Sequence, residues 1–252
     1  MHWATGAETI VKKEGGMGKR LFLAVIIVLV MAGVVFAQGT KPLQLSVFNP
    51  IQMVPEDESI KGVSLDLFYT VNMDFTGFGL SFLGVNQANG DVRGVQWGLG
   101  NWDKGYVYGW QEGIVNYARD RFVGFQDGFV NITEGDFTGV QNGLVNWTEG
   151  FFHGWQNGAF NYTAGRFIGF QHGLINMTKG QASGFGLGAV NYSDGLFTGF
   201  QWGVFNYAAE MHGFQLGLVN WTRSLNGIQV GLGNYNGNKR PLQFMIIANW
   251  SF

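Results

Sequence analysis

The sequence predicts an all-β protein: a closed or nearly closed, shallow barrel of about ten 15-residue β repeats, preceded by a signal peptide. Three observations predict it. An eight-residue motif recurs through most of the chain, no helical period occurs after residue 40, and the composition excludes a disordered chain. Charged residues make up 13% and aromatic residues 16%, so the chain is either tightly packed or in contact with lipid.

Residues 1–37 have the features of an export signal. Basic residues precede the apolar run Leu21–Phe36, and small residues suited to signal peptidase end at Ala37, after which we expect cleavage. Met17 is a natural start for such a peptide, so residues 1–16 are interpreted as an over-long start. The alternative is a retained membrane anchor, because the apolar run is near the short limit for spanning a bilayer.

The charge and the absence of Cys exclude several classes of site. Removing residues 1–37 takes away four basic and two acidic residues, so 15 basic and 17 acidic residues become 11 and 15, a net charge of −4. Without Cys, neither a disulfide framework nor a thiolate metal site can form. The basic surface typical of nucleic-acid binding is also missing. We expect an exported protein of the bacterial cell envelope, at the outer membrane or cell surface.

Residues 38–76 are predicted to supply two or three leading strands. Residues 63–72 are an example of a β-rich run in this segment. The acidic stretch at residues 56–58 is predicted to be a loop.

Residues 77–240 form the predicted β-repeat domain, with the motif Gly-x-Gln-x-Gly-x-x-Asn. Its first glycine stands at 94, 109, 124, 139, 154, 169, 184, 199, 213 and 227, a period of 15 residues that falls to 14 in two late copies. The second Gly and the Asn are present in all ten copies, and Gly186 once replaces the Gln. A degenerate earlier copy begins at Gly79. The motif therefore indicates one structural unit used ten times.

Each copy is predicted to contain about 11 residues of β structure and one short turn. Phe167, Gly169, Gln171, Gly173 and Ile175 share one parity and therefore one predicted face. Thr-x-Gly follows in several copies, and its glycine suits the left-handed residue of a hairpin turn.

A unit of this size cannot bury a core alone. The copies must pack on one another, either by closing into a ring or by stacking as a solenoid. Closure removes exposed strand edges, which favours the barrel. In such a ring the Gln side chains are expected to bond one another, and the Asn side chains to bond the backbone beside each turn.

The residue after the motif Asn is aromatic in eight copies, and these eight residues are the candidate membrane or ligand rim. They are Trp102, Tyr117, Trp147, Tyr162, Tyr192, Tyr207, Trp221 and Tyr235. Trp and Tyr combine an apolar ring with a polar atom, which suits a membrane interface; the alternative role is packing at the turns. If each repeat is a hairpin, all eight lie on one rim, whereas single-strand repeats place them alternately on two rims.

Residues 241–252 are predicted to form a closing C-terminal strand with one apolar face that ends at Phe252. A terminal aromatic residue on an amphipathic strand resembles the end of outer-membrane barrel proteins. An integral outer-membrane β-barrel, acting as a pore or channel, is therefore the alternative. Polar residues on both predicted faces argue against it, with Gln on one face and Glu112 or Asp127 on the other, because a lipid-facing surface is apolar at mid-bilayer.

The ten repeats, the export signal and the closing strand together resemble a group of bacterial surface-repeat proteins. That group resembles the β-flower fold, a shallow, near-symmetric barrel whose hairpin petals surround an apolar channel. The resemblance covers about residues 77–252 and rests on the repeat motif. It implies membrane or lipid association and supplies no site residues.

No arrangement typical of catalysis stands out. His153, His172 and His212 occupy three different places in the repeat, without metal-ligand spacing. The carboxylates lie at variable or turn places, and a tenfold repeat argues against a single catalytic centre. We expect a non-enzymatic protein without cofactor or metal that binds membrane lipid or an apolar ligand, and no nucleic-acid partner.

Overall fold

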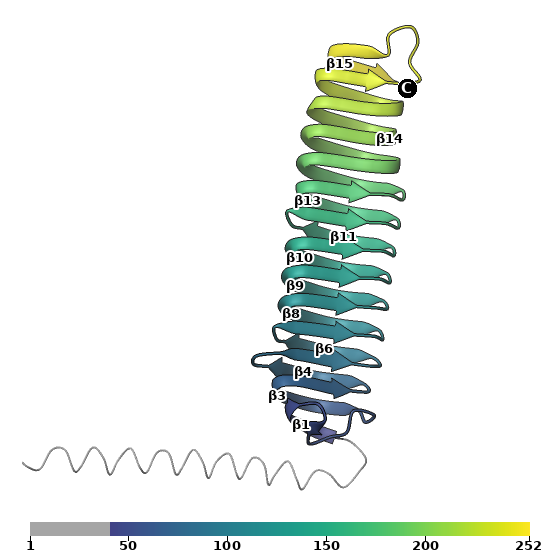
Figure 1. The fold of residues 1–252 in the computed structure, drawn as a ribbon. Coiled ribbons are helices and arrows are strands. Elements are labelled where there is room, and N and C mark those ends of the chain that lie inside the picture. Colours follow the sequence, from purple (N-terminus) through teal and green to yellow (C-terminus); the bar gives the residue numbers. More distant parts are fainter. Residues whose placement is uncertain (1–40) are drawn as a thin grey trace, which may run out of the picture.

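In the computed structural model, which describes residues 41–252, the chain winds into a long stack of β coils (Figure 1). The strands are β1 (Lys41–Phe48), β2 (Ile51–Gln52), β3 (Ile60–Asn72), β4 (Phe75–Ser81), β5 (Val85–Ala88), β6 (Val92–Trp97), β7 (Gly100–Asp103), β8 (Val107–Ala118), β9 (Phe122–Thr133), β10 (Phe137–Thr148), β11 (Phe152–Asn157), β12 (Phe160–Thr163), β13 (Phe167–Thr178), β14 (Ala182–Asn236) and β15 (Phe244–Ser251). β14 continues without interruption through several coils. The described residues are all-β and repeat about every 15 residues, which confirms the predicted class and period.

Consecutive coils pair in parallel, with each residue beside the one 15 positions later. Where β9 meets β10, Phe122 lies beside Phe137 and Gln126 beside Gln141. The 14-residue copies keep this alignment, because Gln201 and Gln215 still bond each other. Equivalent side chains therefore form columns along the stack.

The stack is a β-solenoid, so the predicted closed barrel is wrong. The sheet order runs from β15 at one end to β2 at the other, and these end strands lie at opposite ends of the stack (Figure 1). One repeat is one full coil rather than a hairpin petal. Each coil finds hydrogen-bond partners in the coils before and after it, so the interior strands need no ring closure to satisfy their edges.

A coil contains two strand segments that face each other across a narrow interior. In β9, Phe122 and Gln126 point inward from the first segment, and Asn131 and Thr133 from the second. The Thr133 hydroxyl donates to Gln126 Oε1 across the interior at 3.4 Å. The chain bends at residues 128–130, and the parity of the inward residues changes there.

This bend overturns part of the predicted face assignment. In β13, Phe167 and Gln171 share one face, as predicted, and this face points inward. Ile175 shares their parity but is 37% exposed, while Asn176 is buried. The alternation of a straight strand fails because one residue is used in turning the corner.

The apolar core is a single file of phenylalanine rings. Phe122, Phe137, Phe152 and Phe167 are fully buried, and successive ring centroids lie 5.0, 5.0 and 5.4 Å apart. Burial of one such side chain contributes roughly 1.5–3 kcal/mol. Other apolar residues continue the column toward both ends, so the narrow core runs through the whole stack.

The first glycine of the motif is required by backbone conformation and by close packing. Gly124 has a φ of +139°, and a Cβ atom there would lie 1.9 Å from the carbonyl oxygen of Gly109. The predicted left-handed glycine of the Thr-x-Gly turn is wrong, because Gly135 is not a positive-φ residue. A Cβ on Gly135 would instead lie 2.6 Å from the carbonyl carbon of Asp120. That glycine permits adjacent turns to approach.

The two ends of the stack differ from its middle. β1 pairs in parallel with β3 and antiparallel with β2. β3 and β4 already belong to the stack, with Gly62 beside Gly77 and Gly77 beside Gly94, so coiling begins before the first complete copy. The predicted start of the degenerate copy at Gly79 is wrong, because Gly79 lies beside Gln96 and Gly77 holds the place of the first glycine. β15 runs antiparallel to the end of β14.

The predicted signal peptide, residues 1–37, lies outside the described residues. Between residues 41 and 252, no helix is long and apolar enough to cross a membrane.

Candidate functional site

The eight predicted rim residues lie in one column on one face of the stack, together with Ile132 and Met177, rather than around a rim. We call it the aromatic column. Four pairs have ring centroids less than 5 Å apart: Trp102 with Tyr117 at 4.1 Å, Trp147 with Tyr162 at 3.9 Å, Tyr192 with Tyr207 at 4.8 Å, and Trp221 with Tyr235 at 4.6 Å. Exposure varies from 6% at Tyr162 to 46% at Trp221. The column thus combines side-by-side packing with aromatic surface open to a partner.

A second column, the edge column, follows the second glycine of the motif. It contains Leu99, Ile114, Phe129, Leu144, Ala159, Leu174, Ala189, Val204, Leu218 and Leu232. Phe129, Leu174 and Leu232 are 63%, 64% and 68% exposed. Because every member is apolar, this edge is an exposed apolar ridge along the repeats.

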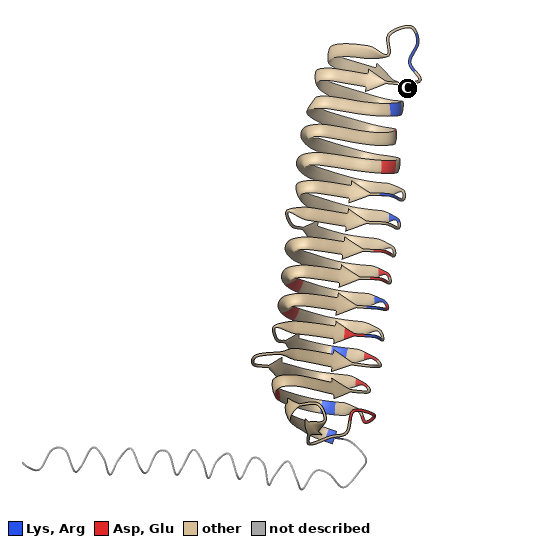
Figure 2. Ribbon diagram, in the orientation of Figure 1, with Lys and Arg blue, Asp and Glu red and all other residues tan. Residues whose placement is uncertain are grey.

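Charged residues gather on the opposite edge, at the turns that follow the second strand segment of each coil (Figure 2). Arg119, Glu134 and Lys179 are examples, and all three are exposed. Glu112 and Asp127 are exceptions, because they lie near the edge column. The repeat region is therefore amphipathic across its width.

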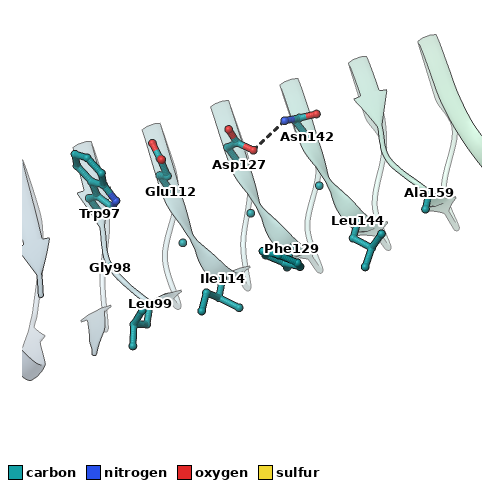
Figure 3. A pocket seen from close by; sticks show the side chains of 13 residues that line it. Trp97, Gly98, Leu99, Glu112, Ile114, Asp127, Phe129, Asn142, Leu144 and Ala159 are labelled. Atoms are coloured by element: carbon teal, nitrogen blue, oxygen red, sulfur yellow. Dashed lines mark hydrogen bonds between the residues drawn. The ribbon is translucent and has the colours of Figure 1, made fainter. Parts of the chain in front are cut away.

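A third column, the mid-face column, precedes the second glycine. It contains Trp97, Glu112, Asp127, Asn142, Asn157, His172, Leu187, Trp202, Leu216 and Val230. Between the mid-face and edge columns, the second glycines form the floor of a glycine groove (Figure 3). This groove consists of two hollows: the first, from Trp97 to Ala159, has a volume of about 670 Å³, and the second, from His172 to Gly231, about 760 Å³.

Interior packing explains why glycine forms this floor. A Cβ atom on Gly143 would lie 2.2 Å from the carbonyl oxygen of Gly128 and 2.6 Å from Asn131 Nδ2. The groove therefore follows from the same close approach that positions the interior Asn column.

Hydrogen bonds join the polar members of the mid-face column. Asn142 Nδ2 donates to Asp127 Oδ1 at 2.9 Å, and Asn157 Nδ2 donates to Asn142 Oδ1 at 2.7 Å. His172 Nδ1 lies 2.8 Å from Asn157 Oδ1. These hydrogen bonds orient the side chains of Asn142, Asn157 and His172 toward the same end of the stack, and the series ends at the carboxylate of Asp127.

The Gln side chains form a buried ladder along the stack, not the predicted ring. Gln141 Nε2 donates to Gln126 Oε1 at 2.9 Å, and Gln156 Nε2 donates to Gln141 Oε1 at 2.9 Å. Gly186 interrupts the ladder. These amides serve the interior and are closed to a ligand.

The Asn side chains form a parallel ladder with a second role. Asn131 Nδ2 donates both to Asn146 Oδ1 at 2.9 Å and to the carbonyl oxygen of Asn142 at 2.8 Å. One side chain thus bonds the next coil and its backbone beside the bend. The predicted bond to the backbone is present, but it lies at the bend beside the second glycine and not at the Thr-x-Gly turn, and the bond from Asn to Asn was not predicted.

Two buried carboxyls were not found by sequence reasoning. Asp103 is fully buried and accepts bonds from Gln111 Nε2 at 2.6 Å, Gln96 Nε2 at 3.1 Å and the backbone N–H of Ala88 at 3.0 Å. Burial raises its pKa to about 7, and these bonds only partly oppose the rise. The sequence did carry a signal, because Asp103 stands where later copies have Thr.

Asp66 is the second buried carboxyl. It accepts a hydrogen bond from the Ser64 hydroxyl at 3.0 Å, and its own exposure is 1%. Burial raises its pKa to about 7. Neither Asp66 nor Asp103 is open to a substrate, so neither is placed in a site.

The part of the chain that the structure describes contains no group of three or more His, Asp or Glu residues able to hold a metal ion. Comparison with protein-family models, with curated proteins and with solved structures found no match for the chain. The resemblance to bacterial surface-repeat proteins therefore rests on the repeat motif alone.

Proposed function

We propose that this chain is a non-enzymatic, exported protein of the bacterial cell envelope that binds a lipid membrane with its edge column and aromatic column. One observation carries the proposal: charge lies along one edge of the repeats and exposed apolar side chains along the other (Figure 2). A contiguous exposed apolar surface of this kind marks an interaction site.

The depth of the aromatic column suits a membrane interface. The second strand segment of this coil begins at Val145, directly after the edge column. Trp147 lies two residues further along this segment. Two residues of strand span about 7 Å, and interfacial elements bury their apolar side by about 5–10 Å. With the edge column in the acyl region, Trp and Tyr would lie at headgroup level, where such rings are favoured.

Repetition strengthens this mode of binding. Each coil offers a small apolar contact, and ten coils held in one rigid row engage a flat surface together. The charged turns lie on the other edge and stay in water.

Vesicle flotation tests the proposal. The purified protein should float with neutral phosphatidylcholine vesicles, and changing Leu174, Leu218 and Leu232 together to Ser should reduce the bound fraction by about tenfold, because three exposed apolar contacts are lost.

The matched control changes Lys179, Asp194 and Arg223 to Ser on the charged edge, and should leave binding within about twofold of wild type. Failure of the wild-type protein to float, or equal losses in both triple variants, would contradict the proposal. Extraction of membrane-bound protein by alkaline carbonate is expected, since the contact is peripheral.

A further inference from the structure

We infer that the glycine groove binds one long amphiphile with a cationic amine head, its head at Glu112 and Asp127 and its hydrocarbon tail along Leu187, Trp202, Leu216 and Val230. The inference rests on the proposed lipid binding and adds the ligand class and its direction. It follows from the order of side chains along the mid-face column, which changes from acidic to amide to apolar.

The acidic end lacks a counter-charge from the protein. Glu112 and Asp127 lie side by side on adjacent coils, about 4.8 Å apart at the backbone. The one ion pair within residues 41–252 joins Lys41 to Glu58, far from this groove. Carboxylates on neighbouring coils repel each other, so a protonated amine that contacts both is favoured. Trp97, beside Glu112 and 52% exposed, offers a ring face to the same cation.

The middle of the column suits neutral, hydrogen-bonding groups. Asn142, Asn157 and His172 are already bonded in one direction toward Asp127, so they are ordered before a ligand arrives. The two amides carry no formal charge. An uncharged linker between head and tail fits this stretch better than a second charge.

The far end is apolar on both walls. Leu187 and Trp202 face Val204 and Leu218 across the floor of the second stretch of the groove. Its volume of about 760 Å³ lies within the range of known ligand sites, about 300–1,000 Å³. From Asp127 to Leu187 the column rises four coils, about 19 Å, so only a long molecule reaches both ends.

Three probes with one octadecyl tail and different heads separate the contributions, because this tail is long enough to reach Leu187 from a head at Asp127. Octadecylamine, octadecanol and octadecanoate are titrated as cyclodextrin complexes, which keep the free probe monomeric, with binding followed by calorimetry and native mass spectrometry. We expect octadecylamine to bind about tenfold more tightly than octadecanol, and octadecanoate to bind least. Glu112→Gln with Asp127→Asn should remove the preference for the amine and leave octadecanol binding within about twofold.

Glu134→Gln with Glu149→Gln is the matched control, because it removes two carboxylates from the charged edge instead of the groove. This control should keep the amine preference. Leu187→Ser should weaken all three probes alike by about threefold, because it changes the tail contact alone. Equal affinity for the three heads, or an amine preference that survives in the Glu112→Gln, Asp127→Asn variant, would overturn the inference.

The vesicle experiment keeps the two proposals apart. The Glu112→Gln, Asp127→Asn variant should still float with phosphatidylcholine vesicles, because its edge column is intact. Flotation without an amine preference overturns the groove assignment alone. An amine preference without flotation overturns membrane binding and leaves the groove as a site for a free amphiphile.

Discussion

At the scale of single residues, the interior of this protein is unusual because amides, not only apolar groups, hold successive coils together. Gln141 and Asn146 are fully buried, yet each donates to its counterpart in a neighbouring coil. A buried amide left without partners would cost about 1–3 kcal/mol. The repeat therefore requires Gln and Asn at fixed places, which explains why the motif is so regular.

The sequence predicted this chemistry in part. The regular Gln residues predicted paired amides, and the pairing is present. The predicted ring was wrong, because a ring and a stack satisfy the same donors and acceptors. The pairing of Asn with Asn was not predicted. Asp103 was missed because a single Asp at a Thr position looks like surface variation until its burial is known.

The two buried carboxyls predict a stability that falls as pH rises. In the folded protein the pKa of Asp66 and of Asp103 is about 7, against 3.8 for the free side chain. Between these values the folded state holds more protons than the unfolded state, so the free energy of unfolding decreases from about pH 4 to pH 7. Each carboxyl should lower it by roughly 2 kcal/mol between pH 5 and pH 8.

Urea unfolding at pH 5 and pH 8 measures this difference. Asp66→Asn combined with Asp103→Asn should flatten the pH dependence, whereas Asp120→Asn at an exposed turn should retain it. A wild-type protein equally stable at both pH values would contradict the burial argument.

At the scale of elements, the bend at the second glycine decides the architecture. The chain turns at residues 128–130, so one repeat contains two facing segments and returns to its starting side. Composition and period could not distinguish a coil with such a bend from a hairpin. Both structures need glycine at the turning point, and both expose the residue beside that glycine. The parity change from Gln171 to Asn176 was visible in the sequence, but it has meaning only once a corner is assumed.

The first glycine of each coil should tolerate no side chain. At Gly139, with a φ of +135°, Gly139→Ala places Cβ 1.9 Å from the carbonyl oxygen of Gly124 and should lower the free energy of unfolding by roughly 3 kcal/mol or more. Gly233→Ala is the control. Its nearest neighbour would be the Phe244 ring at 3.3 Å, and its effect should stay within about 0.5 kcal/mol. Chemical denaturation of both variants measures the difference, and similar losses would refute the close-approach argument.

At the scale of the whole molecule, stability is close to a sum over coils and their neighbours. Each coil contacts mainly the coils before and after it, as expected of a solenoid. The length of the stack is then set by the number of repeats and not by closure, so the apolar ridge and the groove scale with repeat number.

Removal of one whole coil should therefore preserve the fold. Deletion of residues 137–151 joins Asp136 to Phe152 and keeps the phenylalanine file and both amide ladders in register. We expect the same β circular dichroism per residue and a modest fall in melting temperature. Deletion of residues 137–144 puts inward and outward residues out of phase and should prevent cooperative folding. Equal behaviour of the two deletions would show that register does not hold the stack together.

The reversal of β15 has a consequence for how the protein behaves in a crowded compartment. A parallel stack with identical side chains in register has the geometry by which fibrils grow, since each exposed end is a template for another chain. β15 covers the last coil with an antiparallel strand, and the register slips within it where Ile247 adopts a φ of +74°. A strand from another chain that approached in the parallel orientation of the stack would find β15 running the other way, with an irregular edge. β15 thus makes this end of the stack a poor template for another chain, whereas the parallel edge of the last coil beneath it would be open to pairing.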